Sequence, residues 1–110
     1  KMANTFKNKV IADIGTSADG YTVPAATTTT VIGMTVANTT TDIIKVDVTV
    51  VDTSASVTAH LIKDAIIAPG GNLVTIGGDQ KVVLETTDEL NVVSDTASSA
   101  DVVISMMETT

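Results

Sequence analysis

Apolar and polar residues alternate with a two-residue period along the segment 42–51 (DIIKVDVTVV). The apolar side of this segment is formed by Ile44, Val46, Val48 and Val50. The other side carries Lys45, Asp47 and Thr49. Successive side chains of a strand point to opposite faces of a sheet, so this alternation is typical of a half-buried strand. A helix would scatter the two charges among the apolar residues.

Further short apolar segments recur at intervals of roughly ten residues, each ended by turn-forming residues. These segments are 9–14, 21–23, 28–38, 57–63, 65–67, 73–76, 81–85, 90–94 and 101–108. The spacing is typical of a sandwich or a small barrel, and no segment of useful length has a helical period. We predict an all-β fold over residues 1–110, a single antiparallel β-sandwich (jelly-roll or Ig-like) with about eight short strands. Residues 1–8 are a candidate for an extended N-terminal arm.

The same alternation predicts which side chains share one side of the strand in three other segments. The predicted sets are Ile32, Met34 and Val36, then Val57, Ala59 and Leu61, then Val102, Ile104 and Met106. Only 2% of the residues are aromatic, so the core is expected to be aliphatic. Val, Ile and Thr dominate the sequence and suit pleated sheets better than helices, because β-branched side chains are stiff at χ1.

Charge and cysteine usage exclude several function classes. Thirteen acidic residues against six basic ones give a net charge of -7, which repels phosphate backbones and disfavours anionic membranes. Without a basic run or an aromatic platform, we expect no nucleic-acid partner. No run of about 18 apolar residues is present, so we expect no membrane partner. Cysteine is absent from the sequence, which excludes disulfides and thiol nucleophiles.

Catalytic chemistry has few candidate residues. His60 is the only histidine and is expected to be a solvated surface residue, because a lone histidine supplies neither a triad nor a zinc site. The cluster Gly77-Gly78-Asp79 precedes a predicted strand, whereas a phosphate loop needs a following helix, so we interpret it as a tight turn. We therefore predict that the protein is not an enzyme and needs no cofactor.

Aspartates gather at the predicted strand ends and turns. They are Asp13, Asp19, Asp42, Asp52, Asp64, Asp79, Asp88 and Asp95. Loop carboxylates at one end of a sandwich can bind Ca²⁺, which leaves a calcium-dependent adhesive or carbohydrate-binding module as an alternative. The spacing does not match an EF-hand, and aspartate is common in turns because its side chain imitates a backbone turn. The scarcity of aromatic residues also argues against sugar stacking.

Several predicted strands are apolar on both sides, although a free-standing sandwich buries only one side of each strand. A second apolar side that forms a contiguous patch marks an interface. We therefore predict an assembly, which is a homo-oligomer, a larger shell or tube, or both, and expect contact residues on the second side. The candidate interface residues are Ile66, Ile67, Val83, Val93, Val103 and Met107.

The lead-in 21–25 (YTVPA), the Thr run 27–30 and the stretch 31–39 (VIGMTVANT) resemble small structural proteins of tailed phages, especially marine and cyanobacterial ones. The later segments 61–65 (LIKDA), 69–71 (PGG) and 77–85 (GGDQKVVLE) also fit this pattern. The resemblance covers about residues 21 to 108. It departs from the pattern at Ile66-Ile67-Ala68, which is more apolar than an exposed loop should be.

The resemblance implies a virion protein with a β-sandwich or jelly-roll fold. The first expectation is a capsid decoration (cement) protein that binds capsid subunits or sister copies through apolar faces and edge strands. The second is a tail, baseplate or fibre component.

Overall fold

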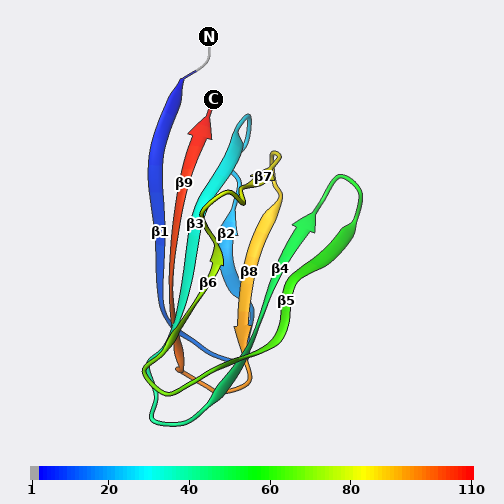
Figure 1. Cartoon of the computed structure of the whole chain (residues 1–110). Helices are drawn as coiled ribbons and strands as arrows, with labels where there is room; N and C mark the ends of the chain where they lie inside the picture. The colour runs from blue at the N-terminus through cyan, green and yellow to red at the C-terminus, as the bar shows by residue number, and fades with distance from the viewer. Residues whose placement is uncertain (1–2) are drawn as a thin grey trace.

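The computed structural model describes residues 3–110, which form nine β-strands and no helix (Figure 1). The strands are β1 (Asn4–Ile14), β2 (Asp19–Thr22), β3 (Thr28–Asn38), β4 (Ile44–Asp52), β5 (Val57–Ile67), β6 (Asn72–Ile76), β7 (Val82–Leu84), β8 (Glu89–Ser94) and β9 (Ala100–Thr109). Residues 1–2 of the predicted N-terminal arm lie outside the described range. Residues 4–8 form the first half of β1 and are paired with β9.

All strand pairs are antiparallel, and they make two sheets packed face to face (Figure 1). The first sheet has the order β1-β9-β3-β6, with β7 also paired to β3. The second sheet has the order β2-β8-β4-β5. The predicted all-β antiparallel sandwich is therefore confirmed.

The pairings identify the sandwich as a jelly roll. β1 pairs with β9, β2 with β8, β3 with β6 and β7, and β4 with β5, so each pair is nested inside the previous one along the chain. Such nesting arises when one long hairpin is rolled up into two sheets, which is the eight-stranded jelly-roll arrangement. β6 and β7 lie one after the other along β3 and together take the place of a single strand. Of the two predicted topologies, the jelly roll is thus the correct one.

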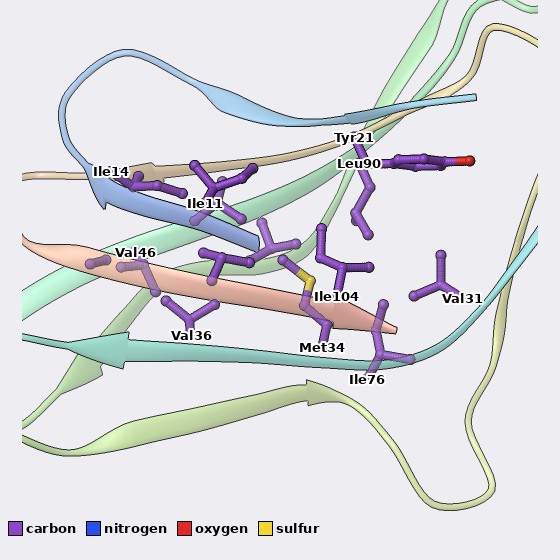
Figure 2. Packing of buried hydrophobic residues seen from close by; sticks show 14 of the residues in the cluster. Ile11, Ile14, Tyr21, Val31, Met34, Val36, Val46, Ile76, Leu90 and Ile104 are labelled. Atoms are coloured by element: carbon purple, nitrogen blue, oxygen red, sulfur yellow. The ribbon is translucent and has the colours of Figure 1, made fainter. Parts of the chain in front are cut away.

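The core between the sheets is aliphatic, as expected from the composition (Figure 2). The predicted inward sets are largely confirmed in the two central strands β4 and β9. The fully buried members are Ile44, Val46, Val48, Val102, Ile104 and Met106. Burying aliphatic side chains of this size contributes about 1.5–3 kcal/mol each, so these two strands supply much of the stability of the fold.

β-Bulges overturn the predicted side of several residues. The register of β3 against β9 shifts between Val31 and Gly33, so Val31 is buried with Met34 and Val36 while Ile32 is not. The prediction that Ile32 shares one side of the strand with Met34 and Val36 was therefore wrong. A bulge adds one residue to one strand, which reverses the alternation of side chains beyond it.

Val57 and Ala59 share one side of β5, as predicted, because they are paired with Asp52 and Val50. The predicted set fails at Leu61, because Ile62 is the residue paired with the buried Val48. Val57 and Ala59 are exposed, and Leu61 is half-buried. The register of β5 against β4 shifts twice, between Val46 and Val48 and between Val48 and Thr49. These shifts are typical of an edge strand, where bulges interrupt the row of free backbone groups that could pair with another chain.

Two polar clusters connect the sheets where aliphatic packing ends. The Tyr21 hydroxyl of β2 donates to Glu108 Oε2 of β9 at 2.6 Å and bonds Thr29 Oγ1 of β3 at 2.7 Å, while Lys7 Nζ lies 3.0 Å from Glu108 Oε1. Burial, followed by the Glu108 hydrogen bond, raises the pKa of Tyr21 to about 12, so the hydroxyl stays protonated and donates. The Tyr21 hydrogen bond, followed by Lys7, lowers the pKa of Glu108, which favours the carboxylate.

Asn38 forms the second cluster, at the other end of β3. Its Nδ2 donates to the backbone oxygens of Asp42 (2.7 Å), Ile67 (3.0 Å) and Ala68 (3.2 Å). Its Oδ1 accepts from the backbone nitrogen of Thr40 (2.9 Å) and from the Thr40 hydroxyl (2.8 Å). The side chain is buried, so it ties the end of β3 to the end of β5 in the other sheet without solvent.

Candidate interaction surface

The outward side of the first sheet carries two rows of apolar and threonine side chains. In an antiparallel pair, directly opposite residues lie on the same side of the sheet. The register therefore aligns one row as Phe6, Met107, Thr30 and Val83, and the other as Val10, Val103, Thr35 and Val74. We call this outward side, including Ile32, Asn8, Ser105 and Ala37, the apolar face. Two of its members, Phe6 (75% exposed) and Val83 (64% exposed), are strongly exposed to solvent.

The apolar face is almost free of charge, although the protein is acidic overall. Among the paired residues described on this side, Asp101 at one end is the single charged one. Lys7 and Lys9 of β1 point to the opposite side, because they are paired with the buried Met106 and Ile104. An apolar sheet surface with so little charge is a candidate interaction site.

The outward side of the second sheet has a different character. Its register brings together Lys45 with Ile66, Asp47 with Val93, and Val51 with Glu89. His60 is exposed on this side, as predicted, with Nε2 3.8 Å from Asp47 Oδ2. Asp47 also lies 3.9 Å from Lys63 Nζ. This mixture of charges is typical of a solvated surface.

A shallow hollow lies between the two rows of the apolar face. It is lined by Phe6, Asn8, Ile32 and Ser105, together with Lys7 and Met106. Small residues explain it, since the strand positions between the rows are Asn8, Ser105 and Gly33. The face thus presents two ridges separated by a depression.

The predicted interface residues divide among three places. Val83, Val103 and Met107 lie on the apolar face. Ile66 and Val93 lie on the charged outward side of the second sheet. Ile67 is 2% exposed and belongs to the core, because it is paired with the buried Ile44. The expectation that Ile67 makes an intermolecular contact was therefore wrong.

Sequence reasoning missed the other half of the apolar face. Phe6, Val10 and Val74 are strongly exposed there. The alternation of Phe6, Asn8 and Val10 was the available signal, but Lys7 and Lys9 stand at the intervening positions where a strand normally carries core residues. They are exposed on the inward side of β1, an edge strand whose first half packs little against the second sheet.

The loop aspartates were considered as a calcium site, and two of them come together with Glu85. Oxygens of Asp52, Glu85 and Asp88 all lie within 4.8 Å of one another. Asp88 is buried and accepts from the backbone nitrogens of Glu85 (2.9 Å) and Thr53 (3.2 Å). Asp52 accepts from the Ser54 hydroxyl and the Ala55 backbone nitrogen, which lowers its pKa. These are the hydrogen bonds of turn-forming carboxylates.

The predicted glycine turns are also present. Gln80 donates its backbone N–H to Gly77 across the β6–β7 turn, and Gly78 has a positive φ of 61°. A strand rather than a helix follows, in agreement with the interpretation of this cluster as a turn. The residues that the structure describes contain no helix long and apolar enough to cross a membrane.

No protein-family model and no curated protein matches this chain. Among solved structures, the chain is similar to T=1 particles derived from infectious bursal disease virus (TM-score 0.49, 12% identity, 96% of this chain and 35% of that chain). It is also similar to the Gx strain of that virus (TM-score 0.47, 12% identity, 97% and 35%) and to its VP2 subviral particle (TM-score 0.42, 14% identity, 96% and 36%). The chain spans about a third of the length of those chains.

Proposed function

We propose that this protein is a non-catalytic structural component of a virus particle, and specifically a capsid decoration protein of a tailed phage. The observation that carries the proposal is the apolar face, a sheet surface with a single charged residue among its described paired positions, on an otherwise acidic jelly roll. Such a surface is suited to permanent contact with other protein subunits, because burying it removes apolar area from water without desolvating charge.

Two further features support a packing role. The jelly roll occurs in viral capsid domains and also in lectins and cupins. The fold therefore supports the proposal by analogy. The sequence resemblance to phage structural proteins points in the same direction. The second candidate, a tail, baseplate or fibre component, rests on the same surface and differs only in its place on the particle.

Immunogold electron microscopy tests the proposal. Antibody against this chain is applied to purified particles of the virus that encodes it. A decoration protein gives gold distributed over the head, because decoration copies cover the shell. Gold confined to one end of the particle indicates a tail, baseplate or fibre component instead. Particles without label, while the chain is detected in the infected-cell lysate, would contradict a structural role.

A further inference from the structure

We infer that the apolar face binds the apolar face of a second copy of this chain, so that two jelly rolls pack sheet against sheet about a two-fold axis. This inference rests on the proposed function, because it assigns an occupant to the surface that carries that function. The argument depends on three properties of the face: its charge, its relief and its area.

Electrostatic repulsion between two copies is smallest when they meet through their apolar faces. With thirteen acidic residues and six lysines, two copies repel each other across most approaches. The outward side of the second sheet would bring Asp47 and Glu89 of both copies together, and unlike the apolar face it would bury lysines as well. The apolar faces meet without that cost, because Asp101 is the single charge among their described paired residues.

Asp101 also selects the relative direction of the two copies. It lies at the end of β9 opposite to the row that contains Phe6 and Met107. A two-fold axis that lies in the plane of the interface and runs across the strands reverses the strand direction of one copy relative to the other. The two Asp101 side chains then lie at opposite ends of the interface. With the axis near Ser105, Val103 of one copy lies across from Met107 of the other.

The relief of the face meets the requirement of a two-fold contact, in which one surface must be complementary to itself. The two apolar ridges stand on either side of the hollow lined by Asn8, Ile32 and Ser105. With the axis near Ser105, the Val103 ridge of one copy packs against the Met107 ridge of the other, on both sides of the axis. Sheets packed face to face lie about 10 Å apart, a distance that side chains of this size span.

The area corresponds to a dimer of moderate affinity. Four strands at about 4.8 Å spacing and eight steps of about 3.4 Å along β1 give a projected footprint of roughly 500 Å². This footprint is smaller than the about 800 Å² per partner of a standard interface, which corresponds to a weaker, reversible dimer. We therefore expect dissociation at micromolar concentrations, with a Kd on the order of 1–100 µM.

Sedimentation equilibrium of the full chain, from about 1 µM to about 500 µM, tests the inference. The wild type is expected to show a monomer–dimer equilibrium. Val103→Glu is expected to weaken the dimer at least about tenfold, since it buries two like charges. The matched control is Ile66→Glu, which changes another exposed aliphatic residue, on the other outward side, and should leave the Kd unchanged. Circular dichroism confirms that both variants remain folded.

A charge pair tests the direction of packing. Met107→Lys alone is expected to weaken the dimer, and an equimolar mixture with Val103→Glu is expected to restore association. Restored association supports end-reversed packing, and continued dissociation of the mixture would overturn it.

Two outcomes would overturn the inference as a whole: a wild type that is monomeric at every concentration, or dissociation by Ile66→Glu and not by Val103→Glu. Immunogold labelling of particles separates this failure from failure of the proposed function. A monomer in solution that still labels particles removes the dimer and keeps the structural role. A dimer in solution without label on particles keeps the dimer and removes the structural role.

Discussion

Replacing Asn38 with alanine is expected to lower the free energy of unfolding by about 3 kcal/mol. The side chain is buried, and its amide donates to three backbone oxygens, of Asp42, Ile67 and Ala68. Alanine removes the amide donor from the Ile67 oxygen and the acceptor from the Thr40 backbone nitrogen. The Ala68 oxygen keeps the Gly71 N–H, and the Asp42 oxygen keeps the Thr40 hydroxyl. Each buried polar group that loses its partner costs about 1–3 kcal/mol. Urea unfolding followed by circular dichroism measures the loss.

Asn72→Ala is the matched control for this experiment. Asn72 is exposed in β6, so the same truncation there should change the free energy of unfolding by no more than about 0.5 kcal/mol. Asn38→Asp is a sharper variant, because it keeps the shape but directs a carboxylate at three carbonyl oxygens. A variant Asn38→Asp as stable as the wild type would show that the amide does not hold β3 to the end of β5.

Replacing Glu108 with glutamine is expected to lower the free energy of unfolding by about 2 kcal/mol at neutral pH and to reduce its dependence on acid. The Tyr21 hydrogen bond, followed by Lys7, lowers the pKa of Glu108 below its ordinary value of 4.5. A carboxyl group with a lowered folded-state pKa stabilises the protein above its unfolded pKa. That stabilisation is lost as the pH falls through the folded pKa. The difference between wild type and Glu108→Gln should therefore shrink in acid.

Urea unfolding at a series of pH values from about 7 to about 2.5 measures this difference. Tyr21→Phe deletes the donating hydroxyl and keeps the Lys7 contact, so an intermediate loss is expected. Asp79→Asn serves as the control for charge, because Asp79 is exposed in the turn after β6. A constant gap between wild type and Glu108→Gln down to the lowest pH would contradict the role assigned to the Glu108 carboxylate.

Much of the fold could be predicted from the sequence, because the β-branched alternation is strong in the central strands. The bounds of β3 were predicted as observed, and the inward sets of β4 and β9 hold at their central positions. The predictions failed where a bulge changes the alternation, as at Ile32 and along β5. Bulges depend on backbone pairing with a distant strand, and the pattern along one strand does not record them. The choice between jelly roll and Ig-like topology likewise depends on long-range pairing.

The apolar face could be predicted only in part. Val83, Val103 and Met107 were recognised as apolar residues on the second side of their strands. Alternation alone cannot show that Val93 and Ile66 belong to the other sheet, since that depends on which strands are neighbours. Ile67 was assigned to a contact because the apolar run before Pro69 resembles a surface patch, whereas pairing with Ile44 turns it inward.

Oxidative footprinting of the methionines measures most directly whether the apolar face works by contact. Met107 lies on the face and is half-buried in the isolated chain, while its neighbour Met106 is buried in the core and serves as the internal reference. Hydroxyl radicals are applied to purified virus particles and to dilute free protein, and sulfoxide is quantified by mass spectrometry. We predict strong protection of Met107 in the particle and low oxidation of Met106 in both samples. Equal oxidation of Met107 in particle and free protein would contradict a contact role for this face.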